Sequence, residues 1–439
     1  MLKVTNPFDH KLIGEVALVG WDQIDRYLDE AQRLYRTQSE WLSVPERSKI
    51  LKKAAQIMTG RAAELAHLIA DEGGKPLIDA RVEVARAIDG VELCIKDLSH
   101  LSGREIPMGL TAAGAGKLAF TYREPIGPVV AVSAFNHPLN LIVHQVAPAV
   151  ATGCPVLVKP ADDTPLSCEA FVKILYEAGL PENWCRSVPC DLATAEKLVT
   201  DPRVAFFSFI GSAKVGWMLR SKLAAGTRCA LEHGGAAPVI VDDSANFDVM
   251  IPKLLKGGFY HSGQVCVSVQ RVFAPRKQAA MIAERLAAGA SKLVVGNAVE
   301  WVDEAVKGGG KALCGGKKLS DTTYAPTVLL DAPADARVSK MEIFGPVVSV
   351  YGYDKVEEAI AAANSLPFAF QSAIFSQDIS KAMAWARLLD SSAVMINEHT
   401  AFRTDWMPFT GRRQSGYGIG GIGYTMHDMT QEKMIVLPA

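Results

Sequence analysis

Three residues of this chain carry side chains that together can act on a carbonyl carbon. Cys266 follows Gly-Gln-Val, and a cysteine thiolate is a strong nucleophile when its surroundings lower its pKa. Glu232, in the run Leu-Glu-His-Gly-Gly, supplies a carboxylate base, and Asn136, in Phe-Asn-His-Pro, supplies an amide donor. A single intracellular cysteine is more often a small buried hydrophobe. The combination of the three residue types favours covalent catalysis by Cys266.

A second group of residues is typical of a nucleotide site. An apolar strand, predicted over 205–210, runs into Gly211 and Ser212 and then into a helical pattern. Backbone amides at a helix N-terminus can hold a pyrophosphate, and a glycine lets the backbone approach it closely. Lys159 and Asp162 follow another buried strand, and a carboxylate at that edge of a parallel sheet can accept hydrogen bonds from ribose hydroxyls. Spacing alone leaves open an ordinary strand-to-helix turn and a solvated charged loop.

Hydrophobic periodicity predicts the elements that must hold these residues. Apolar residues recur at helical spacing from Trp21 to Leu98, which indicates several amphipathic helices. Short apolar strands then alternate with helical patterns, which indicates parallel sheets in two α/β domains joined near Glu232. The predicted strands are 128–133, 155–159 and 205–210 in the first series, and 238–241, 269–273, 347–351 and 373–375 in the second. The segments 118–123 and 434–437 are predicted as exposed strands that can pair with a partner subunit.

The composition excludes several classes of function. The 439 residues exceed what one hydrophobic core usually serves, and 46 Lys and Arg against 47 Asp and Glu leave a net charge of -1. Nothing global therefore favours nucleic acid or an anionic membrane as a partner. The most apolar stretch, 127–158, is interrupted by Asn, His and Pro, which argues against a membrane span. Because the first residues lack the apolar core of a signal peptide and no CxxC pair occurs, we expect reduced thiols, a cytoplasmic protein and no metal site.

Taken together, these segments resemble the NAD(P)-dependent aldehyde dehydrogenase superfamily, and in particular its lactaldehyde and anionic-semialdehyde branches. The resemblance covers nearly the whole chain in the family's order. The matching pieces are the segment around Asn136, Lys-Pro-Ala-Asp at 159–162, Phe-Ile-Gly-Ser at 209–212, Leu-Glu-His-Gly-Gly at 231–235, Gly-Gln-Val-Cys at 263–266 and Glu-Ile-Phe-Gly-Pro at 342–346. The last two pieces are highly specific in combination.

The resemblance implies an α/β fold with a Rossmann-like cofactor domain, an α/β catalytic domain and a small β oligomerisation arm, in a homodimer or homotetramer. The implied boundaries are 1–115 and 128–232 for the cofactor domain, 233–411 for the catalytic domain, and 116–127 and 428–439 for the arm. By the same resemblance, Glu342 holds the nicotinamide ribose and Phe344 packs near the nicotinamide. The other implied cofactor contacts are Ser133, Phe135, Lys159, Asp162, Gly211, Ser212 and Val215.

Several positions depart from the family pattern. Ile210 stands where Thr is commoner, His233 replaces Leu after the general base, and Ala236 replaces Lys, so packing around the cofactor is expected to differ. After Asn297 the family normally continues with a longer connection containing Gly-Pro-Leu-Ile, whereas this chain goes directly to Ala298. Either a loop is absent from the protein or residues are missing from the sequence.

The chemistry predicted from these residues is oxidation of a small aldehyde to its carboxylic acid. Cys266 attacks the aldehyde carbon, and Asn136 with the Cys266 backbone N–H stabilises the oxyanion. Hydride transfer to the nicotinamide leaves a thioester, which Glu232 hydrolyses by taking a proton from water. The alternatives are a surface or helix-capping carboxylate for Glu232 and a turn residue before Pro138 for Asn136. For the whole chain they are a redox-inactive thiol hydrolase or acyltransferase, and an inactive binding protein on the same fold.

The segment 396–409 resembles the substrate mouth of the lactaldehyde and anionic-semialdehyde branches. Arg403 can bind a carboxylate, phosphate or phosphonate through a bidentate fork. Its alternative role is a salt bridge with Asp405 or another acid. Arg86 is a second substrate candidate, and His137 either donates to a polar substrate or is packed in the core.

For the cofactor we predict NAD, with NADP possible. The Asp162 carboxylate should hydrogen-bond the adenosine ribose and repel a 2′-phosphate. Lys159 complicates the prediction, because its ammonium group can pair with that phosphate. Dual use of the two cofactors is therefore compatible with the sequence.

Overall fold

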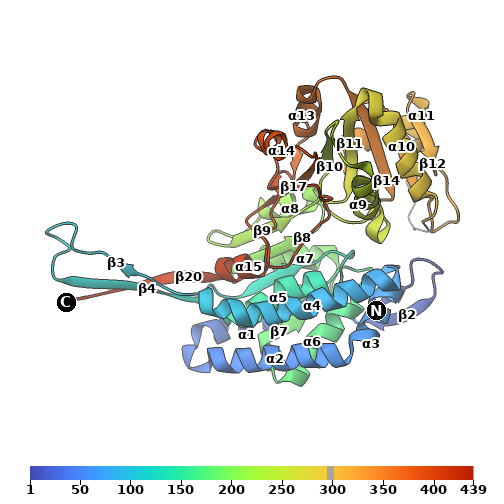
Figure 1. The fold of residues 1–439 in the computed structure, drawn as a ribbon. Coiled ribbons are helices and arrows are strands. Elements are labelled where there is room, and N and C mark those ends of the chain that lie inside the picture. The colour runs from blue at the N-terminus through green and yellow to red at the C-terminus, as the bar shows by residue number, and fades with distance from the viewer. Residues whose placement is uncertain (294–300, 439) are drawn as a thin grey trace.

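The computed structural model describes residues 1–293 and 301–438. Within these ranges the chain forms two lobes, each built on a mostly parallel sheet, and a long antiparallel arm that projects to one side (Figure 1). This arrangement confirms the predicted α/β fold class. The shortened connection after Asn297 lies outside the described residues. In the described ranges, no helix is both long enough and apolar enough to cross a membrane.

The first sheet carries the predicted nucleotide elements. Its strand order is β19 (Gly416–Tyr417), β9 (Arg228–Glu232), β8 (Phe206–Ile210), β5 (Val129–Val132), β6 (Val156–Lys159) and β7 (Cys185–Ser187). All neighbours are parallel except β19, which pairs antiparallel with β9. The chain proceeds from β5 to β6 and β7 on one side, then returns to place β8 and β9 on the other. Ligands bind where strand order reverses in this way, so the predicted cofactor site lies beyond the ends of β5 and β8.

Helices cover both faces of this sheet, which explains why its strands are continuous apolar runs. The predicted helical region 21–98 is helical, and its apolar positions, such as Leu51 and Met58, are buried. The helices of this lobe are α1 (Trp21–Arg36), α2 (Val44–Gly60), α3 (Ala62–Gly73), α4 (Leu77–Asp97), α5 (Asn140–Thr152), α6 (Leu166–Ala178), α7 (Leu192–Val199), α8 (Ala213–Arg220) and α15 (Ile422–Asp428). One core contains apolar residues of α2 to α6 and α15, and another contains those of α1, α7 and α8.

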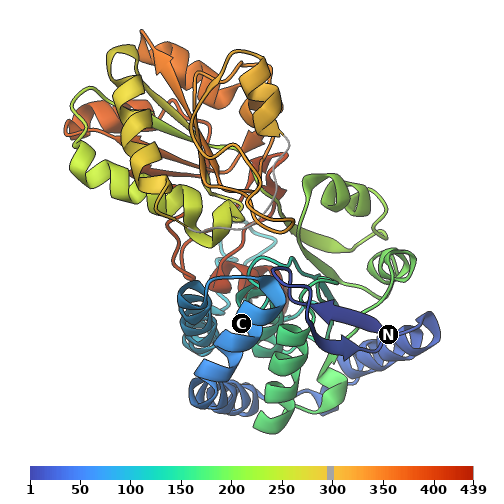
Figure 2. The same ribbon diagram turned by 90° about the vertical axis from the view of Figure 1, so that its right-hand side faces the viewer.

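The second sheet forms the other lobe, which Figure 2 shows above the first. Its strand order is β12 (Lys311–Cys314), β13 (Thr327–Leu330), β14 (Val347–Tyr353), β11 (Val269–Pro275), β10 (Ala237–Val241), β16 (Gln371–Phe375) and β17 (Ala393–Ile396). Only β12 runs antiparallel to its neighbour. The helices of this lobe are α9 (Phe247–Phe259), α10 (Arg276–Ala290), α11 (Trp301–Lys307), α12 (Arg337–Lys340), α13 (Val356–Asn364) and α14 (Ile379–Ala386). Residues of α9 and α10 pack on one face of the sheet, and those of α13 and α14 pack on the other.

The arm is a three-stranded antiparallel sheet ordered β20 (Thr430–Pro438), β4 (Lys117–Pro125) and β3 (Glu105–Ile106). The two predicted exposed strands pair with each other, with Met434 opposite Thr121. Large apolar side chains on the arm remain exposed, among them Phe120 and Ile435. The shorter elements elsewhere are β1 (Leu2–Thr5), β2 (Leu12–Val16), β15 (Phe368–Ala369), β18 (Arg412–Arg413) and the 3-10 turns η1 (Gln38–Glu40), η2 (Leu98–His100), η3 (Glu182–Trp184) and η4 (Tyr260–Gly263).

Candidate active site

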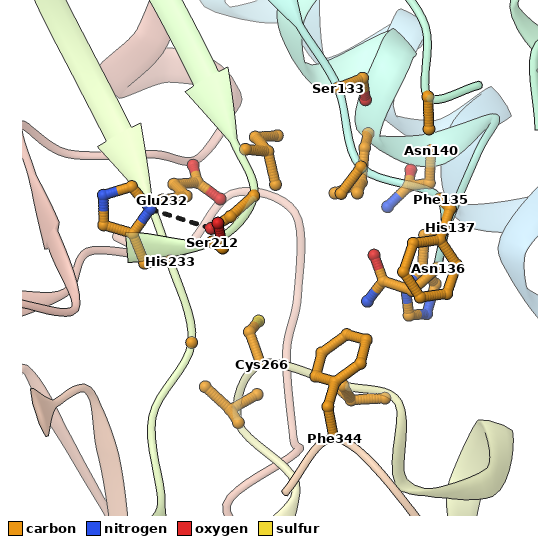
Figure 3. Close-up of a pocket in the computed structure, with 18 of the residues that line it drawn as sticks. Ser133, Phe135, Asn136, His137, Asn140, Ser212, Glu232, His233, Cys266 and Phe344 are labelled. Carbon is orange, nitrogen blue, oxygen red and sulfur yellow. Dashed lines mark hydrogen bonds between the residues drawn. The ribbon is translucent and has the colours of Figure 1, made fainter. Parts of the chain in front are cut away.

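All three predicted catalytic side chains line one cavity of about 480 Å³, with walls from both lobes. Asn136 reaches it from the turn between β5 and α5, Glu232 from the end of β9, and Cys266 from the loop between η4 and β11. Figure 3 shows the three side chains around one open space. The predicted substrate and cofactor residues that also line it are Arg86, Ser133, Phe135, His137, Gly211, Ser212, Val215, Glu342, Phe344 and Arg403.

The segment 260–268, called the nucleophile loop after the candidate nucleophile Cys266, has an unusual backbone. His261, Ser262 and Gly263 follow one another with φ values of 48°, 56° and 73°, in the left-handed region that favours glycine. A Cβ atom on Gly263 would lie 2.2 Å from the Gly345 carbonyl oxygen, so this position has no room for a side chain. Residues with such a strained backbone conformation are held in it by the packing around them, and they cluster at functional sites. The backbone conformation thus sets where Cys266 enters the cavity.

Burial is the largest influence on the pKa values of Cys266 and Glu232. It raises the pKa of the Cys266 thiol to about 12, although the nearby Arg403 guanidinium opposes the rise. Burial also raises the pKa of Glu232, again opposed by Arg403. With the cavity as it stands, Cys266 is therefore a thiol at neutral pH, and forming the thiolate requires a proton acceptor. Glu232 lines the same cavity, where its carboxylate can act as a general base toward water.

Asn136 is held in place by the nucleophile loop. Its side-chain Nδ2 donates to the backbone carbonyl of Gln264 at 2.9 Å, and the residue is buried. Because an amide Nδ2 carries two hydrogens, one remains for an oxyanion in the cavity. This contact joins the predicted oxyanion donor directly to the segment that carries Cys266.

One face of helix α4 holds three segments of the site. Asp79, Glu83 and Arg86 recur at i, i+4 and i+7, so their side chains leave the helix on the same side. Asp79 accepts from the His261 backbone N–H of the nucleophile loop at 3.3 Å. Glu83 accepts from the backbone amides that begin α5 at 2.9 and 3.1 Å, and it also forms a buried ion pair with Lys75. Arg86 donates to the predicted substrate-mouth segment, so α4 ties all three segments together.

The residues at the carboxyl ends of β5 and β8 fit a dinucleotide. Ser212 begins α8 without capping it through its side chain, which leaves the hydroxyl and the helix N-terminal amides for a phosphate. The Ser133 hydroxyl and one Glu342 carboxylate oxygen are buried without a hydrogen-bond partner. Both atoms can form hydrogen bonds with the hydroxyl or amide groups of a bound dinucleotide. Burial raises the pKa of Glu342 to about 8. A Cβ atom at Gly234 would overlap the Glu342 carboxylate, which explains the glycine there.

Phe135 and Phe344 come from different lobes and meet edge to face, with ring centroids 5.9 Å apart. Phe344 has a φ of 48°, which directs its ring into the cavity from the second lobe (Figure 3). The predicted Lys159 and Asp162 do not line this cavity. They form an ion pair with each other after β6, and Asp162 lines a neighbouring cavity that shares Phe135.

His233, one of the departures from the family pattern, packs beneath the nucleotide end of the cavity. Its Nδ1 lies 2.9 Å from the Gly211 carbonyl oxygen, and its ring lies edge-on to Phe209. A Cβ atom at Gly216 would lie 2.0 Å from the same ring, so the glycine makes room for the histidine. The histidine therefore takes a packing role between β9 and α8.

The two candidate arginines have different surroundings. Arg86 donates to Asp405 from Nε at 3.0 Å and from Nη2 at 2.6 Å, so its charge is neutralised by that carboxylate. Arg403 forms no ion pair with any described residue. Its guanidinium lies 3.6 Å from the centre of the Phe409 ring, and its Nε is buried without a hydrogen-bond partner. The predicted alternative of an Arg403 to Asp405 salt bridge is not what the structure shows.

His137 is buried against the rings of Tyr260 and His261, with centroid distances of 6.1 and 5.6 Å. It also lines the cavity, so packing and substrate contact are both compatible with its position. Burial lowers the pKa of His137 well below its ordinary value, with nearby cations acting in the same direction. The ring is therefore neutral at physiological pH.

The sequence did not identify His144 and Asp405 as site residues, although both lie behind Arg403 in the structure. In the sequence, His144 is one of the polar residues that interrupt the apolar stretch 127–158, and Asp405 is a possible salt-bridge partner of Arg403. A signal was present, because His137, Asn140 and His144 recur at helical spacing in a region that is otherwise apolar. Asn140 and His144 lie four residues apart on the buried helix α5 and His137 lies just before it, and polar residues so placed indicate a shared polar environment.

One cavity brings together the candidate nucleophile Cys266, the candidate base Glu232 and candidate dinucleotide contacts, an arrangement that fits a thiol-dependent dehydrogenase. The family model described as the aldehyde dehydrogenase family matches residues 1–435. The 3-sulfolactaldehyde dehydrogenase of Priestia aryabhattai is 32% identical over 457 residues, covering 99% of this chain and 94% of the relative. The chain belongs to the aldehyde dehydrogenase family.

Solved structures agree with this assignment. Aldehyde dehydrogenase 21 from Physcomitrella patens, in complex with the reaction product succinate, superposes with a TM-score of 0.95 and 33% identity. The match covers 100% of this chain and 95% of that chain. Glyceraldehyde-3-phosphate dehydrogenase from Methanocaldococcus jannaschii, complexed with NADP, has a TM-score of 0.94 and 32% identity, covering 100% and 99%. The protein is an NAD(P)-dependent aldehyde dehydrogenase, and the redox-inactive alternatives receive no support.

Proposed function

We propose that this enzyme oxidises a small aldehyde with an anionic tail, using Cys266 as nucleophile, Asn136 as oxyanion donor and Glu232 as base. The observation that carries the substrate class is Arg403, a cation of the Cys266 cavity without a carboxylate partner among the described residues. A guanidinium in such surroundings is stabilised by a bound anion. The named substrates or product of the three relatives above are also anionic, which supports the same class.

The chemical steps follow from where the side chains lie. The Cys266 thiol gives up its proton to water and its sulfur bonds to the aldehyde carbon, while the carbonyl oxygen takes up negative charge beside Asn136. Ser212 and Glu342 would hold the dinucleotide, which would supply the acceptor for the hydride that leaves this carbon. The Glu232 carboxylate then takes a proton from water, the resulting hydroxide bonds to the thioester carbon, and the bond between sulfur and carbon breaks to release the acid and return the Cys266 thiolate.

Replacing Arg403 by alanine is the direct test of the substrate class. For an anionic aldehyde we expect kcat/KM to fall by a factor that corresponds to a loss of about 2 to 3 kcal/mol in transition-state stabilisation, because a charge-assisted hydrogen-bonded pair is lost. Propanal should change little. The measurement is kcat/KM for 3-sulfolactaldehyde, phosphonoacetaldehyde, glyceraldehyde 3-phosphate, succinic semialdehyde and lactaldehyde against propanal.

Arg285→Ala is a matched control, because this exposed arginine pairs with Asp248 on the second lobe outside the cavity. It should leave the whole panel unchanged. Equal losses across the panel in Arg403→Ala would show a structural role and would leave a neutral hydroxyaldehyde such as lactaldehyde as the better substrate.

We propose NAD as the preferred cofactor, with NADP accepted. The half-exposed Asp162 carboxylate supports this preference, and its ion pair with Lys159 supplies the cation that makes NADP tolerable. Asp162→Asn should raise the ratio of kcat/KM for NADP to that for NAD by about tenfold, because a like charge near the 2′-phosphate is removed. The neighbouring Asp163→Asn is the control, since that side chain is exposed and forms no ion pair with described residues. A higher kcat/KM with NADP than with NAD in the parent enzyme would contradict the preference.

We propose further that the arm mediates a homodimer or homotetramer in the cytoplasm. Exposed apolar side chains line both long strands of the arm, at Leu118, Phe120, Tyr122, Met434, Ile435, Val436 and Leu437. A second copy would cover this surface, as exposed strands with apolar side chains usually require. The eight cysteines are free thiols, which supports a reducing compartment.

A further inference from the structure

Arg403 lies at the end of a buried chain of polar contacts that starts on helix α4. The Asp405 carboxylate receives two hydrogen bonds from Arg86, and its Oδ1 lies 2.8 Å from Nε2 of His144. The other ring nitrogen of His144, Nδ1, lies 3.4 Å from Nη2 of Arg403. Asp405 and His144 are each only 4% exposed, so water does not compete for these contacts.

The protonation states of Asp405 and His144 determine which atom donates at each of these contacts. Two hydrogen bonds from Arg86 and one from His144 lower the pKa of Asp405 although burial opposes this, so its carboxylate is ionised and only accepts. His144 must therefore carry its hydrogen on Nε2. Burial lowers the pKa of His144 to about 4, despite the hydrogen bond to Asp405, so the ring is neutral near pH 7. A neutral ring with its hydrogen on Nε2 has a lone pair on Nδ1, which accepts from Arg403.

These contacts leave one side of the Arg403 guanidinium for a ligand. Phe409 lies beneath its plane at 3.6 Å, and His144 occupies one edge through Nη2. Nε is buried without a partner, and Nη1 makes no hydrogen bond with any described residue. A planar cation held at one face and one edge presents its remaining N–H groups in a single orientation.

We propose that Asp405 and His144 form a positioning relay that orients Arg403 toward the anionic end of the aldehyde. This inference rests on the proposed function, because the relay sets the affinity for anionic substrates. Asp405 fixes the tautomer of His144, and His144 fixes the rotation of the guanidinium. Arg86 acts through Asp405 and is a positioning residue in the same sense.

His144→Leu tests the relay, since leucine suits the apolar surroundings of α5 and has neither ring nitrogen. For the best anionic aldehyde we expect KM to rise by about tenfold with kcat within about twofold of the parent, and KM for propanal to stay unchanged. His144→Asn should restore most of the affinity, because its amide oxygen replaces the acceptor at Nδ1. His144→Gln should behave like leucine, since it reaches Asp405 but lacks that acceptor. His67→Leu, an exposed histidine on α3, is the control.

A second measurement does not depend on turnover. Alkylation of Cys266 by iodoacetate, divided by its alkylation by neutral iodoacetamide, reports how well the cavity attracts an anion, with Cys266→Ser as the blank. We expect this ratio to fall about fivefold in His144→Leu and further in Arg403→Ala, and to stay near the parent value in His144→Asn.

The outcomes separate the two proposals. If Arg403→Ala selectively weakens anionic aldehydes while His144→Leu leaves both KM and the alkylation ratio at parent values, the relay is wrong and the substrate class stands. If Arg403→Ala shows no selectivity in turnover while His144→Leu still lowers the alkylation ratio, the substrate class is wrong and the relay stands. Equal rises in KM for anionic aldehydes and propanal in His144→Leu would overturn the relay, because they would show general damage to the cavity.

Discussion

Replacing Cys266 by serine should reduce aldehyde oxidation to less than about a hundredth of the parent rate, because a serine hydroxyl in the same place is far less acidic and less nucleophilic. The fold and cofactor binding should persist, since the two side chains have nearly the same shape. The measurement is the initial rate of NADH formation with a saturating aldehyde, beside thermal melting and NAD titration by protein fluorescence.

Cys314→Ser is the matched control for this change. Cys314 is another partly buried free thiol, but it lies on β12 and does not line the cavity. It should retain the parent rate. Turnover by Cys266→Ser above about a hundredth of that rate, with folding intact, would remove Cys266 from the role of nucleophile.

Replacing Glu232 by glutamine should have a different effect, because it stops the second half of the reaction. We expect a burst of about one NADH per active site in rapid mixing, followed by a steady state slower by at least about a hundredfold. The thioester forms on Cys266 and then waits for a base that glutamine cannot supply. Mass spectrometry of the quenched protein should show the acyl group on the peptide that contains Cys266.

The pH dependence provides an internal check on this role. Burial raises the pKa of Glu232, so in the parent enzyme the carboxylate is protonated at a higher pH than an exposed glutamate. Hydrolysis should therefore slow as the pH falls through that raised value, and this acid limb should be absent in Glu232→Gln. Glu196→Gln, which changes a partly exposed carboxylate paired with Lys222, should keep both the rate and the limb. A folded Glu232→Gln enzyme that gives no burst would show that Glu232 acts before hydride transfer, for example as the acceptor of the thiol proton.

Much of the fold follows from local patterns in the sequence. Strands buried on both faces are continuous apolar runs, and amphipathic helices show a period of 3.6, so segments such as 129–132 and 77–97 were predictable in type and place. The catalytic candidates were also predictable, because Cys, Glu and Asn occur in short motifs with distinctive neighbours. Their roles remain predictions for the variants above, and so do the domain boundaries.

The sequence left the partner of Arg403 undecided. Asp405 is its neighbour in the chain, two positions away, which made a salt bridge between them a reasonable alternative. In the structure the Asp405 carboxylate instead accepts hydrogen bonds from Arg86, which lies far away in the sequence, and from His144, which belongs to a third segment. A carboxylate pairs with whichever donors packing brings within hydrogen-bond distance, and this depends on how α4, α5 and the 396–409 segment meet.

Residue type and short motifs indicated the class of chemistry, because a thiol can serve as a nucleophile, a carboxylate as a base and an amide as a hydrogen-bond donor. Only the tertiary structure decided that Arg86 neutralises Asp405 and that Arg403 forms no ion pair with any described residue. Charge compensation and burial depend on distances between segments remote in the chain, and no local pattern encodes those distances.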